Sequence, residues 1–248
     1  MLKVLINGCN GKMGQVLKNE ISNITDIKVL CGVDKIENVQ NEFPLFTKIE
    51  DINLIPDVII DFSIPESTLN ILEFAKQNNI PTVIATTGFS NEQLEKINSY
   101  TNSLPIFKSA NMSYEINLLS KLVADLALKL PDSDIEIVET HHNRKIDSPS
   151  GTALILADSI NKALNNEKTY EYNRHEKREK RSKKEIGIHS IRGGNECGKH
   201  TVIFFGENDS LEITHNVNSR AIFATGAIKA AKFIVNKNPV VIADIASI

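Results

Sequence analysis

The feature that most constrains the fold is an alternation, over the first hundred residues, of short apolar runs with stretches of helical periodicity. Continuous apolar runs are typical of strands buried on both faces, as in a parallel sheet covered by helices. The alternation therefore predicts a doubly wound α/β unit of the Rossmann type. The expected strands are residues 4–6, 27–33, 58–62, 82–85 and 105–107, and the expected helices are residues 13–21, 67–77 and 91–98.

The pattern changes after Asn111 and predicts a second, smaller α+β unit with an open mixed sheet. The hairpin loop at residues 206–210 has the composition of a turn between two strands. We expect one domain at residues 1–112, completed by residues 221–248, and a second domain at residues 113–220. The elements expected here are helices 115–130, 152–164 and 222–235 and strands 135–140, 186–191, 201–205 and 211–217.

A glycine-rich segment follows the first expected strand and opens the first expected helix: Asn7-Gly8-Cys9-Asn10-Gly11-Lys12-Met13-Gly14. Glycines permit a tight turn and let backbone N–H groups approach a pyrophosphate. The helix N-terminus behind them supplies unpaired N–H donors and a partial positive charge. A turn without a ligand is the alternative, but the strand, glycines and helix in register favour dinucleotide binding.

Other strand ends extend this interpretation. Asp34, after the second strand, is placed to accept hydrogen bonds from ribose hydroxyls, while the adjacent Lys35 could offset a 2′-phosphate, so NADH and NADPH both stay open. Ligands of open parallel sheets lie beyond the carboxyl ends of the strands. Small and hydroxyl residues at two further ends therefore predict the nicotinamide half of the cleft: Ala85-Thr86-Thr87-Gly88 and Ser109-Ala110-Asn111-Met112.

The most informative segment is residues 139–152, which places His141, His142, Arg144 and Lys145 between a strand and a helix. Histidine titrates near neutrality, so it is the natural proton donor at a reacting centre. Lysine supplies a fixed positive charge that stabilises developing negative charge or holds a carboxylate. The helix opened by Ser150-Gly151-Thr152 adds free N–H groups that form an anion site. The segment predicts the active site of a nicotinamide-dependent reductase with a small dicarboxylate substrate.

Two other interpretations of charged or metal-binding residues are weaker. Adjacent histidines on an extended strand point to opposite faces, and no Cys or carboxylate has ligand spacing, so we expect no metal site. The basic run at residues 174–185 has seven Lys/Arg against three Glu. It is interpreted as a solvated loop or frayed helix, with closure over an anionic ligand as the alternative.

The overall composition excludes several classes of protein. The formal net charge of −3 gives no reason to expect nucleic acid or an anionic membrane as partner. Three separated cysteines form no disulfide framework. No secretory leader precedes the first strand, and no apolar run approaches the ~20 residues needed to cross a bilayer. We therefore expect a cytoplasmic enzyme.

At this point the residues resemble the 4-hydroxy-tetrahydrodipicolinate reductase (dihydrodipicolinate reductase) family over nearly the whole chain. The segment His-His-x-x-Lys-x-Asp-x-Pro-Ser-Gly-Thr at residues 141–152 is the most specific match. The others are residues 8–14, Asp61-Phe62-Ser63, residues 85–88 and 109–113, the wider stretch Glu139 to Ala153, residues 187–194, and Phe223-Ala224-Thr225-Gly226-Ala227.

The resemblance implies reduction of 4-hydroxy-tetrahydrodipicolinate to tetrahydrodipicolinate, in lysine and diaminopimelate biosynthesis, by a homotetramer assembled through the sheet of the second domain. It implies His141 as proton donor, Lys145 as its charged partner, and His142 with the Gly151-Thr152 backbone as the site for a substrate carboxylate. The implied contacts to NADH or NADPH are Gly8, Cys9, Asn10, Gly11, Lys12, Met13, Asp34, Ala85, Thr86, Thr87, Ser109, Ala110, Asn111 and Met112.

Three positions depart from the family pattern, none of them within the His–Lys pair. Ser148 stands where alanine is usual, Lys199 stands where an acidic residue is expected, and residues 238–248 lack an aromatic ending. The rivals are another two-domain dehydrogenase, such as an amino-acid dehydrogenase, and a dinucleotide sensor without catalysis. The intact His141, His142 and Lys145 argue against both.

Overall fold

The computed structural model describes residues 1–37 and 39–242, with side chains as far as residue 239. The chain divides into two compact units, one of Met1–Tyr114 with Arg220–Ile248 and one of Glu115–Ser219. Residues 243–248 of the expected segment 221–248, and of the atypical tail 238–248, lie outside the described residues.

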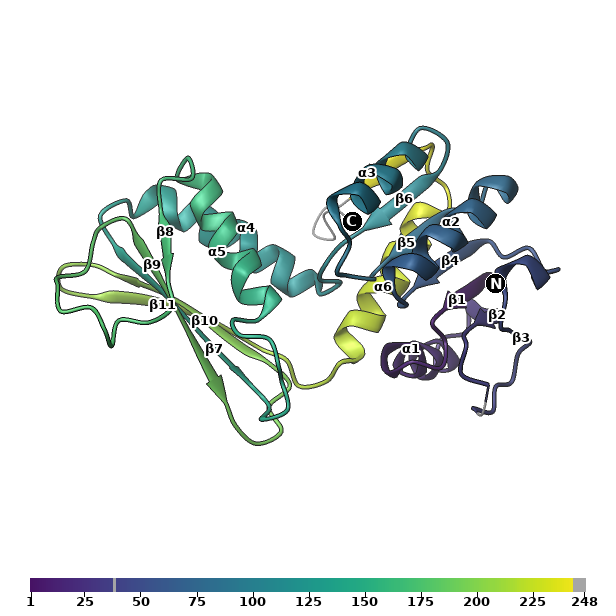
Figure 1. Ribbon diagram of the computed structural model, residues 1–248, viewed down its shortest axis with the longest axis horizontal. Coiled ribbons are helices and arrows are strands. Elements are labelled where there is room, and N and C mark those ends of the chain that lie inside the picture. Colours follow the sequence, from purple (N-terminus) through teal and green to yellow (C-terminus); the bar gives the residue numbers. More distant parts are fainter. Residues whose placement is uncertain (38, 243–248) are drawn as a thin grey trace. The chain divides into compact units, whose positions relative to one another are not determined.

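The first unit is built on a seven-stranded sheet in the order β12-β6-β5-β4-β1-β2-β3. Each neighbouring pair is parallel, so all strands end at the same edge of the sheet (Figure 1). The strands are β1 (Leu2–Asn7), β2 (Ile27–Val33), β3 (Leu45–Phe46), β4 (Val58–Asp61), β5 (Thr82–Ile84), β6 (Pro105–Lys108) and β12 (Val240–Ile242).

Helices cover both faces of this sheet. One core holds the side chains of α1 (Lys12–Ser22) and α6 (Ala221–Ile234) against one face, including Leu17 and Ala227. The other holds α2 (Pro65–Asn78) and α3 (Asn91–Tyr100), including Leu72 and Ile97. The short 3₁₀ helix η1 (Ile49–Asp51) precedes β4. The predicted doubly wound fold is confirmed. Helix α6 lies in this unit.

The second unit has a five-stranded mixed sheet in the order β11-β10-β7-β9-β8. Here β7 pairs parallel with β9 and antiparallel with β10, and β10 and β11 form the expected hairpin. The helices α4 (Tyr114–Lys129) and α5 (Gly151–Ala163) supply the core on one face. The strands are β7 (Asp134–His141), β8 (Thr169–Glu171), β9 (Glu185–Arg192), β10 (Lys199–Phe205) and β11 (Ser210–Asn216).

Burial alternates strictly along β7, which shows that this sheet has one covered face and one open face. Ile135, Ile137, Glu139 and His141 are buried on the helix-covered face, while the intervening residues are half-buried on the open face. A two-residue side-chain period is the property of a strand with one covered face. Glu139 and His141 therefore share a face because of their spacing alone.

Three short strands, β3, β8 and β12, were not expected from the sequence. Each has only two or three residues. A segment of that length carries no measurable periodicity, and its pairing depends on a neighbouring strand rather than on its own residues.

Candidate active site

The glycine turn after β1 is shaped by close contacts between backbone segments. Gly8 has φ +81°, and a Cβ there would lie 2.5 Å from the carbonyl oxygen of Phe62. A Cβ on Gly14 would lie 2.2 Å from the carbonyl oxygen of Gly8. Gly11 is the N-cap residue of α1, and no described side chain caps this helix. The N–H groups of Gly8, Cys9, Asn10 and Gly11 already donate within the protein, so it is the uncapped start of α1 that fits the pyrophosphate of a dinucleotide.

Side chains inside the turn point inward and secure it. Cys9 is fully buried, burial raises the pKa of its thiol to about 12, and its Sγ occupies the space beside Gly32. The Asn10 amide donates to the carbonyl of Ile36 at 2.5 Å. The backbone N–H groups of these two predicted cofactor residues are engaged as well, donating to the Val33 carbonyl and to the Asp34 carboxylate. Lys12 is exposed and Met13 half-buried.

Asp34, just after β2, does more than the sequence predicts. Its carboxylate accepts the backbone N–H of Asn10 at 2.8 Å and that of Ile36 at 3.0 Å, so it also holds the glycine turn. Asp34 lines a cavity of about 490 Å³ in the first unit, together with Gly8, Gly11 and Ser63. Lys35 and Lys48 line the same cavity. It therefore offers a ribose acceptor and two cations side by side.

A buried carboxylate, Asp61 at the end of β4, was missed as a functional residue. It accepts from the Asn7 amide at 2.8 Å and from the hydroxyls of Ser63, Thr68 and Thr86 at 2.5, 2.5 and 2.9 Å. Burial raises the pKa of Asp61, and the hydrogen bonds oppose this shift. The network ties together the ends of β1, β4 and β5. An acidic residue inside the apolar run Val-Ile-Ile-Asp-Phe is the signal that could have found it.

The two remaining predicted strand ends lie at the same edge. The Thr86 hydroxyl is committed to Asp61 and to the Ser63 N–H, whereas Thr87 is exposed and Ala85 half-buried. The Ser109 hydroxyl donates to the Asn111 carbonyl at 2.8 Å and so fixes the loop after β6. Ala110 is exposed and Met112 is buried. The hydrogen bonds of Ser109 and Asn111 set the backbone course of this loop.

In the second unit, His141 ends β7 and is only 8 % exposed. Its Nδ1 lies 2.5 Å from the Oε2 atom of Glu139. Glu139 is fully buried and accepts two hydrogen bonds from Arg192, at 2.8 and 2.7 Å, in a bidentate ion pair. Burial alone raises the pKa of Glu139, but Arg192, Ser190 and His141 outweigh it and hold the pKa at about 2. The predicted proton donor is therefore held by an ionised carboxylate.

The start of α5 adjoins this cluster. Ser150 is its N-cap, and the Ser150 hydroxyl accepts from the Ala153 N–H at 3.1 Å. The same hydroxyl lies 2.9 Å from Nε2 of His200, whose pKa burial lowers to about 4. A Cβ on Gly151 would meet nothing within 4 Å, so the backbone there is open to a ligand. Thr152 follows, half-buried.

Lys145 lies in the same loop, with its Nζ 2.8 Å from both carboxylate oxygens of Asp147. This contact is the main reason that the pKa of Asp147 is lowered. The Lys145 N–H donates to the carbonyl of His142, which sets the loop turn. His142 and Asn143 donate through their backbones to Glu196 and Gly194. These two bonds join the segment that carries His142 and Lys145 to the loop between β9 and β10.

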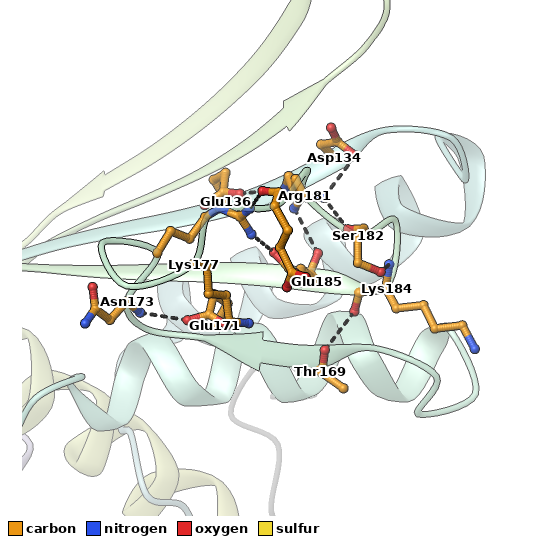
Figure 2. Close-up of polar contacts among 12 residues, drawn as sticks. Asp134, Glu136, Thr169, Glu171, Asn173, Lys177, Arg181, Ser182, Lys184 and Glu185 are labelled. Atoms are coloured by element: carbon orange, nitrogen blue, oxygen red, sulfur yellow. Dashed lines mark hydrogen bonds and ion pairs between the residues drawn. The ribbon is translucent and has the colours of Figure 1, made fainter.

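The basic run at residues 174–185 connects β8 to β9, and Arg174, Lys177, Arg181 and Lys183 are paired with carboxylates of the same unit. Arg181 lies between Glu136 and Asp134, 2.9 Å from each (Figure 2). The same pattern recurs in the pairs Arg174–Glu185 and Lys177–Glu171. The run is an ordered loop fastened to the sheet, which supports the structural interpretation over closure on an anion.

A parallel doubly wound sheet with a glycine turn and an acidic β2 end, in one chain with a carboxylate-held histidine, defines a nicotinamide-nucleotide-dependent oxidoreductase. Residues 2–112 match the family described as dihydrodipicolinate reductase, N-terminus, and residues 115–247 match its C-terminus. The chain belongs to the dihydrodipicolinate reductase family. Members of this family are oxidoreductases of lysine and diaminopimelate biosynthesis that use NADH or NADPH, as the sequence led us to expect.

Relatives of this family align along almost the full length of the chain. A 4-hydroxy-tetrahydrodipicolinate reductase of Caldanaerobacter subterraneus subsp. tengcongensis is 45 % identical over 239 residues, covering 96 % of this chain and 95 % of that protein. That of Clostridium novyi is 41 % identical, covering 96 % and 94 %.

Solved structures agree with this assignment. A dipicolinate-bound dihydrodipicolinate reductase from Paenisporosarcina sp. TG-14 has a TM-score of 0.82 at 26 % identity, covering 100 % of this chain and 99 % of that one. An aspartate dehydrogenase from Thermotoga maritima, at 15 % identity and a TM-score of 0.52 over 96 % and 98 % of the chains, shares only the fold.

Proposed function

We propose that this chain reduces 4-hydroxy-tetrahydrodipicolinate to tetrahydrodipicolinate, with His141 as proton donor and Lys145 as its positively charged partner. The observation that carries the proposal is the buried His141 held by Glu139 in one loop with Lys145. The Paenisporosarcina relative binds dipicolinate, a cyclic dicarboxylate, and this supports a substrate of the same class.

The overall reaction consumes one hydride and one proton and releases water. Substrate, NAD(P)H and H⁺ give tetrahydrodipicolinate, NAD(P)⁺ and H₂O. Reduced nicotinamide supplies the hydride when it is bound. His141 gives up a proton from Nε2 as negative charge develops on the substrate, and Lys145 stabilises that charge.

The substrate carboxylate is assigned to His142 and to the backbone of Gly151 and Thr152. These N–H groups open α5, where the helix dipole favours an anion. Support comes from the open space above Gly151 and from Ser150, which fixes the start of the helix. Glycine lets a carboxylate come close to the backbone.

The cofactor is assigned to the expected first domain, residues 1–112 completed by residues 221–248, and substrate and assembly to residues 113–220. The backbone of Gly8 to Met13 holds the pyrophosphate, and Asp34 binds the adenosine ribose. Residues 85–87 and 109–112 surround the nicotinamide. The cavity that contains Asp34 also contains Lys35 and Lys48, which supports use of either NADH or NADPH.

Assembly and location belong to the same proposal. The open face of the second sheet exposes Ile191 and Phe205, with 51 % and 42 % of their surface accessible. These two exposed apolar side chains support a homotetramer formed through this sheet. No helix within residues 1–37 and 39–242 is long and apolar enough to span a membrane. We assign the protein to the cytoplasm, the compartment of its biosynthetic pathway.

The test is oxidation of NADH, and separately of NADPH, by purified protein supplied with freshly made 4-hydroxy-tetrahydrodipicolinate. Rapid substrate-dependent oxidation is expected, and the ratio of the two rates measures the balance between Asp34 and the neighbouring lysines. Binding of both dinucleotides without oxidation would contradict the proposal and favour a sensor. If the protein instead oxidises an amino acid and reduces NAD⁺, an amino-acid dehydrogenase is favoured.

A further inference from the structure

Glu139 contacts the proposed proton donor, the start of α5 and an arginine at the same time. It lies two residues before His141, on the same face of β7, and is fully buried. Its Oε2 contacts His141 Nδ1, and its Oε1 accepts the backbone N–H of Ser150 at 3.1 Å. Arg192 donates to both oxygens. One carboxylate thus joins the histidine to the N-cap residue of α5.

The charge state of Glu139 fixes which nitrogen of His141 is free. The ion pair with Arg192 keeps the carboxylate ionised, and an ionised carboxylate only accepts hydrogen bonds. The Nδ1 atom therefore carries a hydrogen in both the neutral and the charged ring. Proton exchange is left to Nε2, which faces Gly198: a Cβ there would lie 3.0 Å away. The glycine keeps this side of the ring clear.

We propose that Glu139, anchored by Arg192, is the positioning residue that fixes the orientation and tautomer of His141 and couples it to the carboxylate-binding start of α5. The inference rests on the proposed function, because it assumes that His141 gives up the proton. In that step the Nε2–H bond breaks, its electron pair stays on Nε2, and the Nδ1–H bond to Glu139 is kept. The H⁺ that the overall reaction consumes is then taken up from solvent at Nε2, which restores the Nε2–H bond.

Replacement of the carboxylate by an amide isolates this role. In Glu139→Gln the amide oxygen is drawn to Arg192, which only donates, and the amide NH₂ then faces Nδ1. That contact opposes the Nδ1–H form and the charged ring. We expect kcat to fall about 100-fold, with the Kd for NADH unchanged, since mispositioned general acids lose effects of this size. Glu139→Asp keeps the charge and should recover part of kcat.

Glu185→Gln is the matched control. Glu185 is also a buried glutamate paired with an arginine, Arg174. Glu185 is the first residue of β9 and Arg192 is the last, so the two pairs are roughly 20 Å apart along the strand. We expect this variant to lose stability and to keep kcat. The ¹⁵N chemical shifts of His141, assigned by comparison with His141→Gln, report the tautomer directly. They should change in Glu139→Gln and stay constant in Glu185→Gln.

The outcomes separate this inference from the proposed function. If His141→Gln abolishes turnover while Glu139→Gln keeps both kcat and the His141 tautomer, the positioning role is wrong. If Glu139→Gln lowers only thermal stability, as Glu185→Gln does, Glu139 is structural and the inference is again overturned. Undiminished turnover in His141→Gln would instead overturn the proton-donor assignment itself.

Discussion

At the scale of single residues, the site depends on what surrounds His141 as much as on the histidine. The His–Lys segment is recognisable from the sequence because its residue types are adjacent. Arg192 is not, because it stands 53 residues from Glu139 and meets it only through the pairing of β7 with β9. Glu139 could have been found, since a spacing of two on a strand places it beside His141.

The space in front of His141 gives a direct prediction at this scale. Gly198→Ala adds a methyl group 3.0 Å from Nε2, so the substrate is crowded away from the proton. We expect kcat to drop about tenfold or more, because a displacement of about 1 Å from reacting geometry costs up to 100-fold. Steady-state kinetics would show this. Gly193→Ala, where a Cβ meets nothing within 4 Å, is the control from the same loop and should be silent.

At the scale of elements, the conformation of each strand end depends on hydrogen bonds to the neighbouring strand ends. The glycine turn and the parallel sheet are predictable, because their signals are local and periodic. The Asp61 network is not, since it joins Asn7, Ser63 and Thr86 from three different strand ends. The short strands β3, β8 and β12 were missed for a related reason, as each is defined by its partner.

Asp61→Asn tests whether that network supports cofactor binding. Asparagine offers one acceptor oxygen to four donors, and an unsatisfied buried polar group costs about 1–3 kcal/mol. We expect the free energy of unfolding to fall by that amount and the Kd for NADH to rise about tenfold. Calorimetric titration and urea unfolding measure the two. Asp57→Asn, at an exposed bond to the Lys3 N–H, should leave the Kd unchanged. An unaltered Kd in Asp61→Asn would limit Asp61 to a role in stability.

Helix α5 and β10 meet at the pair Ser150–His200, which predicts a pH dependence of stability. Burial lowers the pKa of His200 to about 4, so below about pH 6.5 the unfolded chain takes up a proton that the folded chain refuses. The free energy of unfolding should therefore fall by about 2 kcal/mol between about pH 6.5 and pH 5 through this group. Measured by urea unfolding, the His200→Gln variant should not show this part of the pH-dependent fall in the free energy of unfolding. An equal fall in the variant and in the natural protein would show that His200 is not its source.

At the scale of the whole molecule, the proposed tetramer makes a separate prediction. Ile191 lies on the open face of the second sheet, opposite Thr140 in the register of β7 and β9. Ile191→Glu would bury a charge in a tetramer interface, which is costly. We expect a smaller particle by light scattering, with dinucleotide binding retained. Ile55→Glu changes an equally exposed isoleucine of the first unit and should keep the assembly. A monomeric natural protein would contradict the tetramer.

The two units are recognisable from the sequence for different reasons. The first follows from strand–helix alternation, a general physical pattern. The second was expected mainly from its hairpin and its resemblance to a family, since its helices and strands follow no repeating order. Its parallel β7–β9 and β8–β9 pairs could not have been derived from hairpin signals.

The most direct test of the central claim compares His141→Gln with the natural protein. Turnover of 4-hydroxy-tetrahydrodipicolinate and the Kd for NADH would be measured in the same preparation. If His141 donates the proton, kcat falls by about 100-fold or more and the Kd stays within about twofold. If kcat is unchanged, another group supplies the proton and the proposed mechanism is wrong.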